Sequence, residues 1–360
     1  MLGRDKGVSD ISEHAGIKDL ASVEENPDIL QIAHALVRSI ERRKTSAGKP
    51  YFDLELGDCS RTFPAKIWGD RSEELQAAGE LEPGMVVKVA FQADRYQGSV
   101  QLNIKRLRRV TDLDEDYDEE KVFGAGYALI KDLACETLVF DIETVPRCDR
   151  RDLPKTVAET VAKHAEKHSQ DESMVMGLSP YLGKIVSLAF GDGERSGDDQ
   201  PITVLAVPPQ GREDDDFPEW IRPMSEADLL RAFWCLAALS KRVVSFNGTG
   251  FDVPFLIGRS LIHEIDVHVD LVSRRWSNQR HIDLLPILGG RWRGPSTLDV
   301  VCWSLGIESP KGEMDGSMVA PAYARGEIEN IATYNAHDVR ATSAVYNCVR
   351  DRLLRFTQSS

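Results

Sequence analysis

Two carboxylates stand at the end of an apolar run near the middle of the chain. Leu138, Val139 and Phe140 lead directly into Asp141 and Glu143, a pattern typical of a buried strand that ends in polar residues. Side chains on a strand alternate between its faces, so both carboxylates are expected on one face. Held this close, they repel and raise each other's pKa. Mg²⁺ or Mn²⁺, which prefer oxygen ligands, would remove that conflict, although a strand end exposed to water has the same sequence pattern.

Two further carboxylates follow in patterns that place them on helices. Asp252 comes after a glycine-rich turn and two residues before Pro254, which suits the first turn of a helix. Its side chain can cap that helix or face a metal, and one oxygen is available for each role. Tyr334 and Asp338 lie four residues apart in a long helix expected over 328–354, so they share one face.

In this order the motifs resemble those of a known family. Asp-Ile-Glu on a strand, Asn-x-x-x-Phe-Asp before a helix and Tyr-x-x-x-Asp on the last helix match the three motifs of DEDD 3′–5′ exonucleases. The tyrosine marks the DEDDy branch. The chain resembles in particular the stand-alone bacterial exonucleases that are similar to the exonuclease domain of family-B DNA polymerases. Residues 281–284 and 311–317 also look like that group, and the resemblance covers about 135–355.

This resemblance implies a fold, a site and a reaction. The fold would be an α/β ribonuclease H-like domain, with helices on both faces of a mixed sheet whose first three strands are antiparallel. Asp141, Glu143, Asp252 and Asp338 would hold two Mg²⁺ or Mn²⁺ ions. Tyr334, a poor base at neutral pH, would orient the attacking water. The expected reaction is hydrolysis at the 3′ end of single-stranded DNA or RNA.

The apolar patterns supply elements for such a domain. A helix is expected over 124–135, another over 153–168 and a third over 225–240, the last with Ser225 as its N-cap. The five expected strands cover 137–143, 184–190, 202–207, 242–246 and 281–284.

Several residues near the second motif are candidates for contact with substrate. Asn247 and Phe255 are expected to line the cleft, whereas Phe251 is more typical of the core. Arg259, one helical turn after Phe255, could reach a phosphate or a surface carboxylate. Asp283 is expected to anchor local structure rather than to bind metal.

Residues 31–111 have the pattern of a small β domain. Five strands with alternating apolar residues are expected, and one of them contains Phe52, Leu54 and Leu56. A helix near 72–78 separates the third strand from the fourth. This arrangement predicts an all-β OB-fold barrel. The sequence around strands two and three also resembles the OB domains that precede the catalytic unit in some bacterial exoribonucleases.

The barrel carries residues suited to a nucleic-acid strand. Aromatic rings can stack on bases and basic groups can contact phosphates on the face where OB-folds bind single strands. The alternative is a barrel that docks on a protein partner. The candidates are Tyr51, Lys66 and Trp68 on strands two and three, Arg95 and Tyr96 in the loop between strands four and five, and Lys105 and Arg106.

These readings divide the chain into an N-terminal arm (1–30), an OB-fold nucleic-acid-binding domain (31–111), an acidic linker (112–122) and a DEDDy exonuclease domain (123–360). The linker is expected to be solvated.

Composition limits the partners. The net charge of −14 requires that any nucleic acid bind a local basic patch. Six scattered cysteines and the lack of a long apolar run favour a cytoplasmic protein without a membrane segment. A nucleic-acid-binding or scaffold protein with a decayed nuclease site is the alternative function, although no expected carboxylate is missing.

Overall fold

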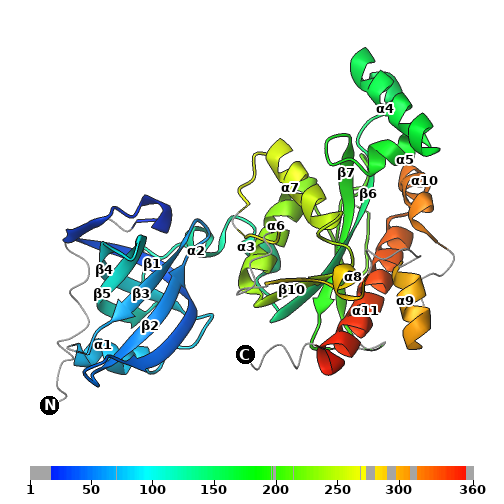
Figure 1. The fold of residues 1–360 in the computed structure, drawn as a ribbon. Coiled ribbons are helices and arrows are strands. Elements are labelled where there is room, and N and C mark those ends of the chain that lie inside the picture. The colour runs from blue at the N-terminus through cyan, green and yellow to red at the C-terminus, as the bar shows by residue number, and fades with distance from the viewer. Residues whose placement is uncertain are drawn as a thin grey trace. The chain divides into compact units, whose positions relative to one another are not determined.

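The computed structural model describes residues 18–69, 71–195, 197, 200–213, 215–267, 269–272, 280–289, 297–308 and 314–353. The chain divides into two compact units, Met1–Ala128 and Leu129–Ser360 (Figure 1).

The first unit is a closed five-stranded barrel with strand order β1-β2-β3-β5-β4, as expected for an OB-fold. Its strands are antiparallel neighbours except β3 and β5, which pair in parallel. A short helix lies between β3 and β4. The bounds are β1 Asn26–Lys44, β2 Pro50–Gly57, β3 Thr62–Ile67, α1 Ser72–Ala78, β4 Val86–Tyr96 and β5 Ser99–Arg109.

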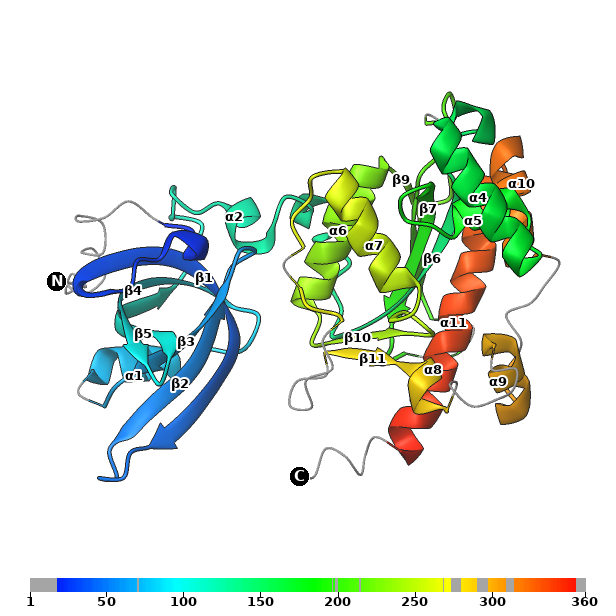
Figure 2. The ribbon, with the colours of Figure 1, turned by 45° about the horizontal axis from the view of Figure 1, so that its top comes forward.

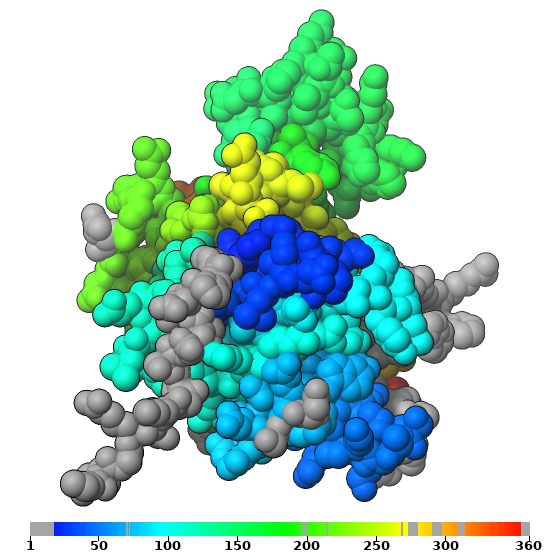
Figure 3. All heavy atoms as spheres, turned by 90° about the vertical axis from the view of Figure 1, so that its left-hand side faces the viewer, coloured from blue at the N-terminus to red at the C-terminus, as the bar shows by residue number. Residues whose placement is uncertain are grey.

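The barrel begins earlier than the sequence pattern indicates. Strand β1 starts at Asn26, and before it the 3-10 helix η1 (Leu20–Ser22) puts Leu20 into the core. The backbone N–H of Leu20 donates to Asp58 Oδ2 at 2.6 Å. In Figure 3 the dark-blue atoms of this first segment lie against the cyan atoms of the barrel. The described part of the expected arm therefore packs on the barrel.

The acidic segment after β5 is exposed at most of its residues, as a solvated linker would be, but two of its aspartates are bound to the barrel. The Asp114 side chain is only 3% exposed and accepts hydrogen bonds from the Arg108 guanidinium, while Lys88 Nζ donates to Asp116 at 2.6 Å. Basic residues on β4 and β5 thus hold the segment on the barrel. The helix expected over 124–135 is also shorter than the pattern suggests, because α2 (Glu119–Phe123) ends at Gly124 and α3 covers only Tyr127–Ile130.

The second unit contains a six-stranded mixed sheet with order β11-β10-β6-β7-β8-β9. Strands β6, β7 and β8 are antiparallel neighbours, whereas β10 runs parallel to both β6 and β11. All five expected strands are present, and β9 is an addition of three residues. The bounds are β6 Thr137–Pro146, β7 Gly183–Asp192, β8 Ile202–Ala206, β9 Ile221–Pro223, β10 Arg242–Ser245 and β11 His281–Asp283.

Helices cover both faces of this sheet: α6 and α7 lie on one side and α11 on the other (Figures 1 and 2). Ser225 caps α6 as expected, its hydroxyl accepting from the backbone N–H of Asp228. None of the helices among the described residues is long and apolar enough to cross a membrane. The bounds are η2 Arg150–Asp152, α4 Lys155–His168, α5 Glu172–Gly177, α6 Glu226–Leu239, α7 Asp252–Ile262, α8 Leu284–Ile287, α9 Leu298–Leu305, η3 Gly316–Met318, α10 Val319–Arg325 and α11 Ile328–Arg352.

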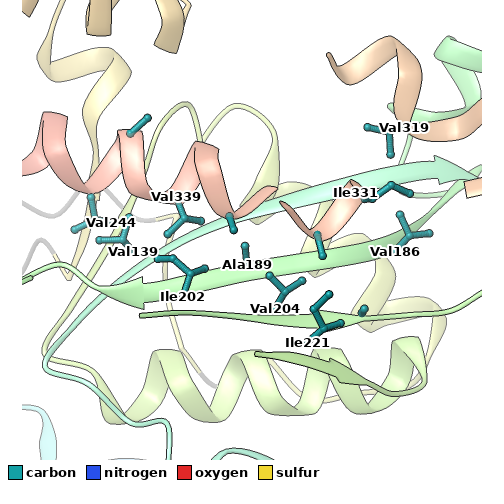
Figure 4. Packing of buried hydrophobic residues seen from close by; sticks show 14 of the residues in the cluster. Val139, Val186, Ala189, Ile202, Val204, Ile221, Val244, Val319, Ile331 and Val339 are labelled. Carbon is teal, nitrogen blue, oxygen red and sulfur yellow. The ribbon is translucent and has the colours of Figure 1, made fainter. Parts of the chain in front are cut away.

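The alternation of β6 decides which layer each of its side chains enters. Phe140 points toward α6, where its ring lies 4.8 Å from that of Phe233. Val139 belongs to the opposite layer and packs with Val244 of β10 and Val339 of α11 (Figure 4). Because the period of a strand is two, the odd-numbered Asp141 shares the α11 side of the sheet with Val139.

Candidate active site

Carboxylates from β6 and α11 meet in one cluster. Asp141, Glu143 and Asp338 each offer an oxygen, and these three oxygens lie within 4.8 Å of one another. Strand alternation places the first two on the face that α11 covers, and the third stands on α11 itself. Residues almost 200 positions apart are thus brought together by packing of the last helix on the sheet.

Asp252 reaches β6 from a different direction. Strand β10 pairs with β6 only as far as Val244 opposite Val139, and it ends one residue later at Ser245. The backbone N–H of Ile142 lies beyond that pairing and donates to Asp252 Oδ1 at 3.3 Å. Asp252 is 3% exposed and is the first residue of α7 rather than its cap, which is Phe251. It lies outside the 4.8 Å cluster but anchors α7 beside it.

Asp283 holds the turn that delivers Asp252. Its carboxylate accepts from the backbone N–H of Asn247 at 2.8 Å and of Thr249 at 3.0 Å. It also caps α8 by accepting from Leu285 N–H. The expected anchoring role of Asp283 is therefore what the structure shows. Asn247 has φ 68° and lies exposed in this turn, so its contact with substrate stays a prediction.

Burial and mutual repulsion raise the pKa of the carboxyl groups. Burial is the main reason that the pKa of Asp141 lies well above its usual value, and the charges of Asp252, Asp338 and Glu143 raise it further. Glu143 is shifted upward by burial and then by Asp338 and Asp252. Burial also raises the pKa of Asp252 to about 7, although hydrogen bonds from backbone N–H groups oppose the rise.

Tyr334 lies on the face of α11 that carries Asp338. Burial raises its pKa far above the ordinary value, and Asp338, Glu143 and Asp141 raise it further. The phenol therefore keeps its proton at every physiological pH, and it hydrogen-bonds to Asp338. A protonated phenol beside the cluster can donate a hydrogen bond but cannot serve as a base.

Two residues of this site were not predicted from the sequence. Asn335 Nδ2 donates to Asp141 Oδ2 at 2.6 Å, and Ser187 Oγ donates to Asn335 Oδ1 at 2.7 Å. The signal was available: Ser187 is a polar residue within an apolar strand, and Asn335 lies between Ile331 and Val339 on the buried face of α11. Polar residues at such positions need a hydrogen-bonding partner in the core.

The prediction that Phe255 lines the cleft is wrong. Phe255 is 1% exposed and packs in the core, with its ring 5.6 Å from that of Phe251, which is the more exposed of the two. Arg259 contacts a carboxylate rather than solvent or phosphate. Its guanidinium donates to both oxygens of Glu226 at 2.8 and 2.7 Å, and the pair is buried.

The ligand set of the cluster fits a hard divalent cation. Its candidate ligand atoms are carboxylate oxygens, which Mg²⁺ and Mn²⁺ prefer over softer donors. The pKa values of Asp141 and Glu143 are raised because their carboxylates lie at a partly buried place, close to other negative charges. A bound cation would offset these charges.

On the barrel, four predicted residues come together as a Lys66 cluster, consisting of Tyr51, Lys66, Trp68 and Tyr96. Lys66 Nζ lies 5.3, 5.4 and 5.8 Å from the ring centroids of Tyr51, Trp68 and Tyr96, respectively. The Tyr51 and Trp68 rings stack on each other at 5.4 Å, and the indole N–H donates to Asn103 Oδ1 at 3.2 Å. Trp68 is 39% exposed and Tyr96 57%. The cluster presents rings and a cation to solvent.

The other predicted barrel residues lie outside the contacts of the Lys66 cluster. Arg95 donates to Glu25 at 2.9 and 2.6 Å, so a carboxylate of the same unit offsets its charge. Lys105 lies at an irregularity of β5 where the pairing with β4 shifts, and Arg106 follows it on the exposed surface.

Comparison with known proteins bears out the resemblance in the second unit. Residues 181–358 match the family described as a predicted 3′–5′ exonuclease related to the exonuclease domain of PolB. The matched region contains Asp252, Tyr334 and Asp338. Asp141 and Glu143 precede it, so their place in the site is given by the structure.

Two curated relatives are 3′–5′ exoribonucleases named YhaM. The protein of Halalkalibacterium halodurans is 30% identical over 83 residues, which are 23% of this chain and 25% of the relative. That of Bacillus subtilis is 32% identical over 80 residues, 22% of this chain and 24% of the relative. The chain thus spans about a quarter of the length of these relatives.

Among solved structures, the family B DNA polymerase of Pyrobaculum calidifontis aligns with 88% of this chain and 46% of the polymerase, with 13% identity and a TM-score of 0.40.

Proposed function

We propose that this chain, whose residues 181–358 match the exonuclease family related to PolB, is a metal-dependent 3′–5′ exonuclease acting on single-stranded nucleic acid. The observation that carries the proposal is the meeting of Asp141, Glu143 and Asp338 within 4.8 Å, with Asp252 anchored beside them. Hydrolysis of a phosphodiester needs this kind of acidic site, because divalent cations must offset the charge of the substrate.

Asp141, Glu143, Asp252 and Asp338 would hold two Mg²⁺ or Mn²⁺ ions. Bound ions of this kind lower the pKa of the attacking water and stabilise the charge on the leaving oxygen. The protein supplies the frame: β6 presents two carboxylates on one face, α11 brings the third, and the Ile142 N–H fixes Asp252.

Tyr334 would orient the attacking water. Its raised pKa keeps the hydroxyl protonated, so the group acts through a hydrogen bond and takes no proton. Loss of the hydroxyl should therefore slow the reaction without abolishing it, since the carboxylates remain.

The barrel would bind the strand. The Lys66 cluster offers exposed rings for stacking and an ammonium group for phosphate, a combination found in proteins that bind single strands without sequence preference. We propose the first unit, which contains the expected domain 31–111, as the binding module, and the second unit, which begins at Leu129 rather than at 123, as the catalytic module. Because the curated relatives are exoribonucleases, RNA is the first substrate to test, with DNA of the same sequence beside it.

The test uses RNA and DNA strands of one sequence, each labelled at the 5′ end in one set and at the 3′ end in another. With Mg²⁺ or Mn²⁺, a ladder of shortened 5′-labelled products and release of single labelled nucleotides from the 3′ end are expected. EDTA should stop the reaction, and Ca²⁺, which takes longer bonds and more ligands, should support it poorly.

Undiminished cleavage in EDTA, or by the Asp141→Asn variant, would contradict this assignment. Strand binding with no hydrolysis in either metal would instead favour the alternative function, a nucleic-acid-binding protein whose nuclease site has decayed.

A further inference from the structure

A buried chain of hydrogen bonds links three elements behind the carboxylate cluster. Ser187 on β7 donates to Asn335 on α11, and Asn335 donates to Asp141 on β6, at 2.7 and 2.6 Å. Ser187 is 1% exposed and Asn335 is fully buried. Ser187 also lies directly opposite Glu143 in the pairing of β6 with β7. The series of hydrogen bonds therefore runs from the strand partner of Glu143 to Asp141 itself.

The carboxylate and the serine together fix which end of the amide faces Asp141. An asparagine side chain can turn over and present either its NH₂ group or its oxygen. An ionised carboxylate only accepts hydrogen bonds, so the NH₂ group faces Asp141, and the Ser187 hydroxyl supports this orientation by donating to Oδ1. The reversed amide would put two acceptor oxygens together in a buried place, which is costly.

We propose that Asn335, oriented by Ser187, is a positioning residue that holds the Asp141 carboxylate in the orientation in which it binds a divalent cation. The inference rests on the proposed metal site. Its hydrogen bond occupies one carboxylate oxygen of Asp141 from the protein side. Groups that orient metal ligands in this way commonly change metal affinity by 10- to 100-fold when they are removed.

The position of Asn335 on α11 gives this contact a second consequence. Asn335 lies three residues before Asp338, so both are on the turn of the helix that faces β6. A hydrogen bond from Asn335 to Asp141 therefore sets the register of α11 against β6, and that register brings Asp338 to the cluster. Because Asn335 is fully buried, water cannot take the place of its amide after a substitution without entering the core.

Binding of Mn²⁺ without nucleic acid tests the proposal directly. Isothermal titration calorimetry with MnCl₂ on the full chain compares the parent protein with Asn335→Ala, Ser187→Ala and Ser187→Thr. Asn335→Ala should weaken Mn²⁺ binding by about 10- to 100-fold. Ser187→Ala should weaken it less, about 3- to 10-fold, because Asp141 alone then orients the amide. Ser187→Thr keeps the hydroxyl and should bind as the parent does.

A kinetic readout separates positioning from loss of a ligand. The Mn²⁺ concentration that gives half the maximal rate should rise in Asn335→Ala by the same factor as the dissociation constant, and saturating Mn²⁺ should restore most of the rate. Asp141→Asn should not recover in this way. Asn347→Ala is the matched control, because Asn347 lies on the same helix but donates to the Ser343 carbonyl, and its Mn²⁺ affinity should be unchanged.

Equal Mn²⁺ affinity in folded Asn335→Ala and the parent would overturn the proposal, as would a parent protein that binds no Mn²⁺. If circular dichroism shows that Asn335→Ala does not fold, the smaller change Ser187→Ala decides by the same comparison. A parent that binds Mn²⁺ but degrades no strand would refute the proposed exonuclease, whereas weaker binding in Asn335→Ala would still support the positioning role.

Discussion

Two groups of acidic residues among those that the structure describes have similar geometry but opposite pKa shifts. In each, three candidate ligand atoms lie within 4.8 Å: one group is Asp141, Glu143 and Asp338, and the other is His34, Asp114 and Asp116 on the barrel. A search for acidic residues close in space would return both. Only their surroundings distinguish them.

The barrel group is neutralised by its own chain. The Arg108 guanidinium holds the pKa of Asp114 well below its usual range, helped by the N–H of Thr111, and Lys88 donates to Asp116 at 2.6 Å. In the nuclease unit the pKa of Asp141 rises instead, through burial and then through other carboxylates. The lowered pKa of Asp114 fits a structural ion pair, whereas the raised pKa of Asp141 fits a cluster whose charge a bound cation would offset.

The largest test of this contrast is the loss of one carboxylate from each group. Asp141→Asn should reduce hydrolysis by more than about a thousandfold, because one ligand and its charge are lost. Its free energy of unfolding in EDTA should stay the same or rise, since a repulsive charge has gone. Asp114→Asn should leave the rate of the folded protein unchanged. The rate of nucleotide release and the urea unfolding curve of each variant test these two expectations. A fully active Asp141→Asn protein would place the site elsewhere.

Much of the site could be predicted because its residues form ordered motifs. Strand alternation puts Asp141 and Glu143 on one face, and the helical repeat does the same for Tyr334 and Asp338. That these pairs form one site was implied by the resemblance of the motifs to those of DEDDy exonucleases. The barrel strands follow from alternation too, as with Phe52, Leu54 and Leu56. Periodicity of this kind depends only on residues that are close in the sequence, so it can be recognised without knowledge of tertiary packing.

Three of the differences depend on packing between elements. Whether Phe255 faces a cleft or the core depends on the side of α7 that meets the sheet and its neighbours. Asp114 looks solvated until the strands bring Lys88 and Arg108 beneath it. Asn335 acquires a role only when α11 lies across β6 and β7. In each case the partner is distant in the sequence or belongs to another element.

The proposed function places strand binding on the barrel rather than on the carboxylate cluster, and Trp68 tests this. If its indole stacks on a base, Trp68→Ala should cost about 1–3 kcal/mol of binding, or about 5- to 150-fold in affinity. Trp68→Phe keeps an aromatic face and should lose less. Fluorescence anisotropy with a labelled RNA, across a salt series, measures both. Unchanged affinity in Trp68→Ala would indicate that the barrel serves a protein partner.

A smaller effect is expected on the stability of the barrel. Asp114→Asn removes the charge paired with Arg108 in a place where the aspartate side chain is 3% exposed. Arg108 keeps access to water, which offsets part of the lost interaction, so the free energy of unfolding should fall by about 2 kcal/mol. Asp112→Asn, an exposed change in the same segment, is the control and should have little effect. Equal urea midpoints for the two variants would show that the segment does not stabilise the barrel.

The smallest test uses pH, and the two groups should respond with opposite signs. The pKa of Asp114 is lowered on folding, so its stabilisation is present above the unfolded value near 4 and is lost as pH falls through the lower folded value. The pKa of Asp252 is raised to about 7. Its contribution to the free energy of unfolding is therefore fully present below about pH 4 and is lost as pH rises through 7.

The variant Asp252→Asn, compared with the parent in EDTA, measures this loss. At pH 8 it should raise Tm by a few degrees, about 2–4 °C for each kcal/mol by which the free energy of unfolding increases, and at pH 5 it should raise Tm by less. The amide oxygen still accepts from Ile142, which makes the substitution nearly isosteric. Calorimetry at the two pH values measures the difference, and an equal Tm change at both would mean that Asp252 is ionised in the folded protein throughout this range.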